Sequence, residues 1–292
     1  FFRGVSLYRA QLIAGKRVGR CVHAGYFARQ PHPLEDVVRI NKLSAVVVAT
    51  TLATTGGLVP EAPATAAVGY TASVVPGSTA AGRIYNVDVG PDGAVYLSLI
   101  DSCTVEILNP NGSRTRVAGS GTCFMGGNTP PADSGLATTV DLGIPRQSAV
   151  DSDGNLYFGD DWCRVLKVDT AGMLSRVAGG GTQTASGVPA LSADLCAGSG
   201  DTVTGVEIAA DGSVLINNQD GRLRRVDSSG ELTIITADLD FGGPINADSQ
   251  GNVFAVQPFN VTKIAPDSNT LILAGAGTFG YSRDDGQALA AE

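Results

Sequence analysis

Histidine is the scarcest chemically versatile side chain in this 292-residue sequence. Its two copies, His23 and His32, lie close to the N-terminus, and residues 67–292 contain none. A Ser-His-Asp triad, a Cys-His pair and a His-ligated metal site therefore cannot be built from residues 67–292. This absence excludes several familiar routes to catalysis for most of the chain.

Positive charge is also scarce. Residues 67–292 hold 12 of the 20 basic residues and 25 of the 28 acidic ones, which gives a formal net charge of −13. Nucleic-acid binding needs lysine and arginine to displace counterions, and anionic membranes attract basic segments. The charge therefore predicts no nucleic-acid partner, and it suits a protein that stays soluble outside the cell.

Long apolar runs are missing, and the short one at residues 43–52 follows two basic residues. An Ala-Thr-Ala sequence stands at 64–66, where a signal peptidase would cut. This order is typical of a secretory signal peptide, and the run is too short to predict a membrane span. We therefore predict a signal peptide at 37–66 and a secreted or surface protein that begins at Ala67, without membrane insertion after cleavage.

Residues 1–36 show no sustained hydrophobic periodicity, and no methionine occurs before Met125. We interpret residues 1–36 as misassigned upstream sequence, with translation beginning near Val37 or Val38. The alternative is a genuine N-terminal extension.

A calcium loop is suggested at first sight by Asp151, Asp153 and Asn155, which alternate around a glycine. An EF-hand loop needs a bidentate glutamate at its twelfth position and a helix on each side. The twelfth position here is Trp162, and the residues after it alternate as in a strand. We therefore interpret the two aspartates as turn residues.

The same pattern recurs along the chain, because four segments align with one another and each contains two tight turns. The first turns fall at Asp92-Gly93, Asp153-Gly154, Asp211-Gly212 and Gln250-Gly251, and the second at Asn111-Gly112, Ala171-Gly172, Ser229-Gly230 and near Ser268-Asn269. Short runs rich in Val, Ile, Leu and Tyr flank these turns, which predicts strands joined by hairpins. Four antiparallel strands per unit, repeated, predict an all-β fold, a β-propeller with blades near 83–120, 143–180, 203–238 and 243–276.

The stretch VDSDGNLYFGDDWCRVLKVDTAGMLSRVAGGGT resembles the NHL repeat, in the form found in bacterial secreted propellers and in the teneurin propeller. The resemblance covers about residues 71–292, and residues 274–292 resemble the family's connector between blades. It implies a six-bladed ring, of which about four blades are present, so we expect the propeller of residues 67–292 to be C-terminally truncated. Residues 72–76 would then be an outer strand that closes the ring, and unpaired faces and edges would favour self-association.

The cysteines occupy repeated places in two of the blades. Cys103 and Cys163 come just before the third strand, and Cys123 and Cys196 lie in the connectors after the fourth. The other two blades lack cysteine at both places. Residues 67–292 contain an even number of cysteines, as expected for disulfides in an exported protein. Because a blade has cysteine at both places or at neither, we predict the disulfides Cys103–Cys123 and Cys163–Cys196. Free thiols or another pairing are the alternatives.

The single tryptophan, Trp162, lies on a predicted loop beside Asp160 and Asp161. An aromatic ring with two acids on a loop face suits a basic or polyhydroxylated partner. The alternative is a tryptophan packed over the neighbouring disulfide or an adjacent blade. Arg164 and Arg222, which follow this loop in their blades, are expected to bind loop carbonyls or acids rather than a ligand.

Two functions follow from these patterns. The first is a non-catalytic binding module for a protein or carbohydrate, with no cofactor and no catalytic residues. The alternative is a calcium-dependent, lactonase-like hydrolase that holds Ca²⁺ in the central channel. Glu207 and Asp88, on predicted inner strands, are candidate ligands for that metal, although sequence spacing does not show that they converge.

Overall fold

The computed structural model describes part of the chain, and that part is nearly all β. The described ranges are 7–13, 16–22, 38–42, 70–74, 82–126, 130–196, 202–237, 239, 242–280 and 287–291. Residues 43–66 of the predicted signal peptide and its cleavage point at Ala67 lie outside these ranges, so both stay predictions. The described residues contain no helix long and apolar enough to cross a membrane.

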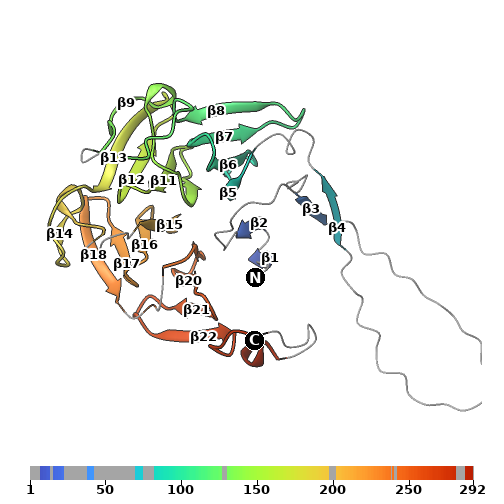
Figure 1. Ribbon diagram of the computed structural model, residues 1–292. Helices are drawn as coiled ribbons and strands as arrows, with labels where there is room; N and C mark the ends of the chain where they lie inside the picture. The colour runs from blue at the N-terminus through green and yellow to red at the C-terminus, as the bar shows by residue number, and fades with distance from the viewer. Residues whose placement is uncertain are drawn as a thin grey trace, which may run out of the picture.

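Sixteen strands form four antiparallel blades that follow one another around a common centre, which confirms the predicted propeller class (Figure 1). Blade 1 contains β5 (Ile84–Val89), β6 (Val95–Leu99), β7 (Thr104–Leu108) and β8 (Arg114–Ala118). Blade 2 contains β10 (Ser148–Val150), β11 (Leu156–Asp160), β12 (Arg164–Val168) and β13 (Met173–Gly179). Blade 3 contains β15 (Val203–Ile208), β16 (Val214–Asn218), β17 (Leu223–Val226) and β18 (Glu231–Thr236). Blade 4 contains β19 (Ile245–Ala247), β20 (Val253–Val256), β21 (Val261–Ile264) and β22 (Thr270–Ala274).

The tight turns form where the sequence predicts them, because each contains a residue with a positive φ angle that glycine adopts readily. These residues are Gly93, Gly112, Gly154, Gly172, Gly212, Gly230, Gly251 and Ser268. In the turn that resembles a calcium loop, Asp151 Oδ1 accepts hydrogen bonds from the backbone N–H groups of Asp153 and Asn155. Asp151 and Asp153 are therefore turn residues, as predicted.

The connectors between blades contain structure that the repeat pattern did not predict. The connector after blade 1 contributes β9 (Gly135–Leu136) and the 3-10 helix η2 (Ala137–Thr139), and β9 pairs with β13 at the outer edge of blade 2. The connector after blade 2 repeats this with β14 (Val188–Pro189), which pairs with β18, and with η3 (Ala190–Ser192). Each of these two connectors therefore joins its own blade to the rim of the next.

Four further strands precede the blades. β1 (Leu7–Ile13) pairs with β2 (Lys16–Val22), which pairs with the inner strand β5. β4 (Tyr70–Val74) pairs with β3 (Val38–Lys42). This pairing differs from the expectation for residues 72–76, because β4 lies beside β3 and not in a closing blade (Figure 1).

The core lies between consecutive blades, where the side chains of one sheet face pack against the next sheet. We call the side of a blade that faces the following blade its forward face, and the opposite side its backward face. Three apolar clusters fill the contacts of blades 1 and 2, 2 and 3, and 3 and 4. Burial of these clusters is the main force that holds the blades in order.

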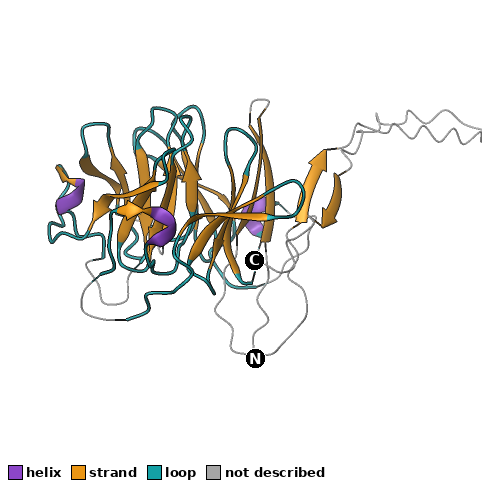
Figure 2. Cartoon of the chain, turned by 90° about the horizontal axis from the view of Figure 1, so that it is seen from above, coloured by secondary structure: helices purple, strands orange, loops and turns teal. Residues whose placement is uncertain are grey.

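The strands run between two sets of loops (Figure 2). The tight turns that join first to second and third to fourth strands gather on one side of the blades. The loops that join second to third strands, together with the connectors, gather on the other side, because consecutive strands are antiparallel. We call this second side the loop face, and it carries the cysteines and Trp162.

Candidate functional site on the loop face

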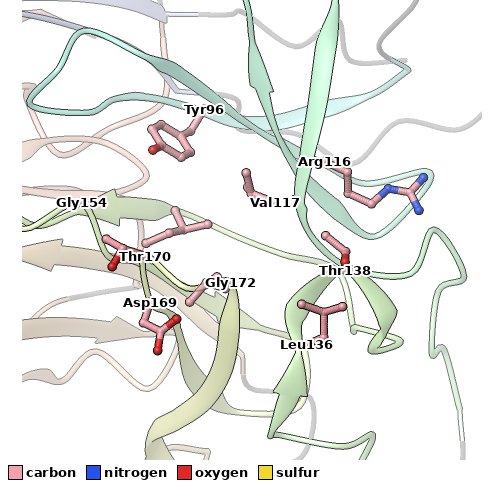
Figure 3. A pocket seen from close by; sticks show the side chains of 11 residues that line it. Tyr96, Arg116, Val117, Leu136, Thr138, Gly154, Asp169, Thr170 and Gly172 are labelled. Carbon is pink, nitrogen blue, oxygen red and sulfur yellow. The ribbon is translucent and has the colours of Figure 1, made fainter.

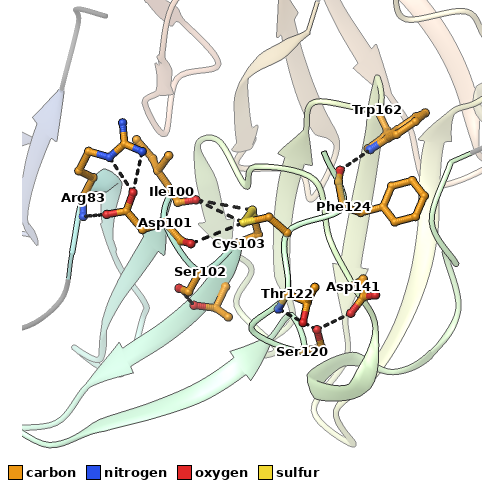
Figure 4. The surroundings of a disulfide bond; sticks show 12 residues. Arg83, Ile100, Asp101, Ser102, Cys103, Ser120, Thr122, Phe124, Asp141 and Trp162 are labelled. Carbon is orange, nitrogen blue, oxygen red and sulfur yellow. Dashed lines mark hydrogen bonds and ion pairs between the residues drawn. A yellow bond between two sulfur atoms is a disulfide. The ribbon is translucent and has the colours of Figure 1, made fainter. Parts of the chain in front are cut away.

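Two disulfides lie on the loop face, and they have the predicted pairing. Cys103 bonds to Cys123, with a Cα–Cα distance of 5.0 Å (Figure 4). Cys163 bonds to Cys196, with a Cα–Cα distance of 5.7 Å. Cys103 and Cys163 share an unusual backbone conformation, with φ angles of 50° and 57°. The closed loops span 20 and 33 residues, and on the chain-entropy model each bond stabilises the fold by roughly 3–4 kcal/mol.

Trp162 packs against the residue that follows the first disulfide. Its indole ring lies 5.4 Å from the ring of Phe124, centroid to centroid, and its Nε1–H donates to the Phe124 carbonyl at 3.2 Å (Figure 4). A Cβ atom at Gly143 would lie 2.8 Å from Trp162 Cδ1, so this glycine leaves room for the indole. Trp162 therefore joins blade 2 to the connector that leaves blade 1, and its side chain remains partly exposed.

Asp160 is fully buried, and it pairs with Arg164, whose side chain is 1% exposed. Arg164 also donates from Nη1 to the carbonyl of Pro131 at 2.7 Å, and a bond to a loop carbonyl is what the sequence predicts for this arginine. Burial raises the pKa of Asp160, while its bonds with Arg164 oppose that change. The predicted ligand role of Asp160 does not fit this position, because its carboxylate is bonded at the base of the loop and is not accessible to a ligand.

Asp161 forms a second, shallower ion pair. Its carboxylate lies 2.6 Å from Arg146 Nη2, and the Arg146 guanidinium lies 4.8 Å from the centroid of the Tyr85 ring. Burial raises the pKa of Asp161, and the nearby Arg146 charge opposes the rise. Both side chains of the pair keep about a quarter of their surface exposed, so a partner on the loop face could still reach them.

The exposed part of this region is apolar. Met125, which follows Phe124 in the chain, is 68% exposed, and Phe124 and Trp162 are each partly exposed. We call Phe124, Met125 and Trp162 the aromatic loop cluster. Its position next to a disulfide limits its motion. The sequence does not predict Phe124 as part of this site, because only its packing on Trp162 identifies it, and Met125 joins the cluster as the exposed residue that follows Phe124 in the chain.

The equivalent loop of blade 3 uses a different arginine from the one expected. Arg224, with 2% of its side chain exposed, pairs with Asp220 and donates to the carbonyl of Arg222. Arg222 Nη1 lies 3.9 Å from Asp220, which is a looser ion pair. The burial of Arg224 could not be read from the repeat, since its equivalents in the other blades are uncharged or acidic.

Asp88 and Glu207, the candidate calcium ligands, occupy the same register on the inner strands of blades 1 and 3. Asp88 pairs with Tyr96 and Glu207 with Leu215, and Asn246 has the same place in blade 4. Among the described residues, however, no three His, Cys, Asp or Glu side chains lie close enough to hold a metal ion. The calcium of the hydrolase alternative therefore stays an expectation from the sequence.

A pocket of about 230 Å³ opens between blades 1 and 2, away from the disulfides (Figure 3). Tyr96 and Arg116 line it from blade 1, and Asp169 and Thr170 line it from blade 2. Asp169 accepts the backbone N–H groups of Ala171 and Met173, so its carboxylate already serves the turn. The pocket follows the seam between the two blades.

Comparison with known proteins supports the fold. No protein-family model matches the sequence, and no curated protein matches it. A protein of unknown function from Bacteroides thetaiotaomicron is 16% identical, with a TM-score of 0.52 over 75% of this chain and 54% of its own. Virginiamycin B lyase from Staphylococcus aureus is 12% identical, with a TM-score of 0.43 over 70% of this chain and 59% of its own. A protein described as a gluconolactonase is 15% identical, with a TM-score of 0.49 over 69% of this chain and 66% of its own.

The chain thus spans between 54% and 66% of the length of these three proteins. Structural similarity at sequence identities this low concerns the fold alone and shows nothing about chemistry, because one fold hosts many unrelated activities.

Proposed function

We propose that the protein is a secreted, NHL-type β-propeller that acts as a binding module, and that the aromatic loop cluster is its contact surface for a protein partner. The observation that supports this most directly is the contact of two partly exposed aromatic rings, Phe124 and Trp162, followed in the chain by Met125 at 68% exposure. Binding concentrates on loops that a rigid scaffold holds in place. Here the scaffold is two blades, and the two disulfides fix the loops.

The chemistry of the cluster favours a protein over a carbohydrate. Tryptophan, phenylalanine and methionine are residue types enriched at the centre of protein interfaces. The partly exposed pair of Asp161 and Arg146 would lie at the rim, where charges steer partners more than they bind them. The net charge of −13 over residues 67–292 favours a partner with a basic surface.

Secretion is supported by three features that agree. The predicted signal peptide would export the mature protein, both disulfides suit an oxidising compartment, and the acidic composition of residues 67–292 suits solubility there.

The test is a comparison of the wild-type protein with Trp162→Ala. Peptides would be selected from a displayed random library on the wild-type protein, and glycans would be screened on an array in parallel. We expect selected peptides to be basic and to bind Trp162→Ala about 1 kcal/mol more weakly or worse, as at an interface hot spot. Phe259→Ala is the matched control, because Phe259 is 45% exposed on the loop face of blade 4.

A purely structural role for Trp162 predicts a different pattern. Loss of the contact with Phe124 would then lower the melting temperature while peptide affinity stayed at the wild-type value. If the protein bound glycans on the array and no peptides from the library, its partner would be a carbohydrate and the protein-partner proposal would fail.

A further inference from the structure

The outer edge of each blade is its fourth strand, and in blades 2 and 3 the preceding connector covers that edge. β9 pairs with β13 and β14 pairs with β18, each antiparallel to the strand that it covers (Figure 1). In blade 3 the Gly187 N–H also donates to the Leu232 carbonyl, and the Ile234 N–H donates to Ser186 Oγ. The protein itself therefore shows what an outer edge of this fold takes as a partner, which is a short extended segment.

Blade 4 has no such cover among the described residues, because β22 is the last strand of its four-stranded sheet. The cause lies inside the sequence. The connector before blade 4 is residues 237–244, whereas those before blades 2 and 3 are residues 119–147 and 180–202. A chain reaches at most about 3.5 Å per residue. The short connector can therefore cross from β18 to the inner strand β19, but it cannot also reach the rim of blade 4 and return.

The side chains of β22 agree with an edge that the connector leaves uncovered. Thr270 occupies the register position of Leu174 in blade 2 and of Leu232 in blade 3. These two leucines are 2% exposed and pack in clusters with Ala137 and Ala190 of the covering connectors. Thr270 is exposed. A polar residue therefore stands where the cover is missing.

The rest of this edge is able to accept a strand. β22 has the sequence Thr-Leu-Ile-Leu-Ala, without charge or proline. Leu271 on its forward face is 60% exposed, and Ile272 on its backward face is 45% exposed. Exposed edges are usually protected from pairing by charged side chains or proline. The outer strand β8 of blade 1 has such protection, since it contains Arg114 and Arg116, whereas β22 has none.

We propose that the outer edge of β22 is a docking site for an extended, aliphatic segment of a partner protein, which adds antiparallel to β22 as a further strand of blade 4. Main-chain hydrogen bonds would hold the segment, as in other proteins that bind a peptide by adding a strand to a sheet. Its direction follows from β9 and β14, which are both antiparallel to the strands that they cover. This contact is separate from the aromatic loop cluster and does not depend on it.

The register of blade 3 identifies the backbone groups that would bind the segment. Ile272 has the position of Ile234, and Thr270 has the position of Leu232. In blade 3 the N–H of Ile234 and the carbonyl of Leu232 both point outward to the connector. The Ile272 N–H and the Thr270 carbonyl are therefore the expected donor and acceptor.

The chemistry of the segment follows from its neighbours on β22. Side chains on adjacent strands contact one another on each face of a sheet. Leu271 and Ile272 lie on opposite faces, so each would contact an aliphatic side chain of the added strand. The net charge of −13 over residues 67–292 disfavours an acidic segment. The occupant is therefore a stretch with aliphatic residues on both faces and without aspartate or glutamate.

The probe is a synthetic peptide with the sequence of residues 184–192, which contains the strand that covers blade 3. It carries Pro189→Ile, because proline lacks the N–H that strand pairing needs. The peptide is titrated into the full ¹⁵N-labelled chain and followed by NMR. We expect shift changes in the amides of Thr270–Ala274 and slower hydrogen exchange at Ile272, with a dissociation constant of about 1 mM or lower.

Two methylated forms of this peptide test whether the contact is made by the main chain. They carry N-methyl groups at alternate backbone nitrogens, in opposite phase. Because the backbone groups of successive residues in a strand point in opposite directions, one form should bind and the other should not. Equal affinities of the two forms, whether high or low, would overturn the proposal.

Ile272→Pro tests the same hydrogen bond from the side of the protein. It removes the outward N–H, and proline is tolerated at edge positions whose N–H points away from the sheet. We expect the peptide to bind this variant about tenfold more weakly, because a main-chain hydrogen bond is lost. Ile272→Val is the matched control, since it keeps both the N–H and a β-branched aliphatic side chain, and it should bind as the wild type does.

Three results would overturn the proposal. The first is peptide binding that Ile272→Pro leaves unchanged. The second is the absence of shift changes in β22 at about 1 mM peptide, or their appearance in β18 instead. The third is an Ile272 amide that is already protected from hydrogen exchange in the free chain, since the edge would then be covered by another part of the protein.

Discussion

Single residues divide into those whose role is local and those whose role depends on the fold. The aspartates and glycines of the turns act within four residues of themselves, and the sequence predicts them correctly. The cysteine pairs were predictable because the repeat places them at equivalent positions. The pairing of Asp161 with Arg146 was not, because 15 residues separate them and only the packing of the connector on the loop brings them together.

At this scale we expect the loss of the buried ion pair between Asp160 and Arg164 to lower the free energy of unfolding more than the loss of an exposed pair. Asp160→Ala would leave the buried Arg164 without its carboxylate, and we expect a loss of about 3–5 kcal/mol in the free energy of unfolding. Asp101→Ala removes the partner of Arg83 in a pair whose side chains are 47% and 67% exposed. That change should cost about 1 kcal/mol or less. Equilibrium denaturation of both variants measures the difference, and equal losses would contradict this assignment of Asp160.

At the scale of elements, the strands follow from alternating apolar residues between turns that contain glycine. The short strands β9 and β14 escaped prediction because two residues carry no periodicity. Their pairing depends on a distant partner, since β9 meets β13 and β14 meets β18 only after the blades are stacked. Tertiary contact, and not local propensity, forms these elements.

The hairpin turns make the fold sensitive to acid. Desolvation raises the pKa of Asp151, but hydrogen bonds from Asn155, Tyr157 and Asp153 outweigh it and hold the pKa below its usual value. A lowered pKa in the folded state means that Asp151 stabilises the fold at pH values above about 3.9. This contribution is lost as the pH falls through the lower pKa of the folded state.

Asp151→Asn tests this dependence, because an amide oxygen still accepts backbone hydrogen bonds but carries no charge. We expect the free energy of unfolding, measured by urea denaturation, to fall less for the variant than for the wild type when the pH is lowered from about 5 to below about 4. Asp153→Asn is the control, since Asp153 contributes its backbone N–H to the turn. If Asp151→Asn lost as much stability in acid as the wild type, Asp151 would not be a source of the acid sensitivity.

At the scale of the whole molecule, the sequence repeat predicts the order of the blades. It does not predict the contacts that blades make across the centre. The most distant of these is made by Gln147, just before β10 of blade 2. Its side-chain oxygen accepts from the N–H of Ile245, and its Nε2 donates to the carbonyl of Ile245, at 2.9 and 2.7 Å. The two residues are 98 positions apart and are 1% and 2% exposed. No repeat predicts this link, because the other blades have Asn86, Gly205 and Pro244 at the equivalent place.

This link gives a final prediction for the molecule as a unit. Gln147→Ala removes both hydrogen bonds from a buried site, and each buried group that loses its partner costs about 1–3 kcal/mol. We therefore expect a loss of about 2 kcal/mol or more in the free energy of unfolding, measured by chemical denaturation. Because Gln147 joins blade 2 to blade 4, amide hydrogen exchange should become faster in β10 of blade 2 and also in β19 of blade 4.

Gln183→Ala is the control, at an exposed glutamine of the connector after blade 2. It should change neither the free energy of unfolding nor the exchange rates. A stability loss confined to blade 2, with unchanged exchange in β19, would show that the two blades are held in place without this link.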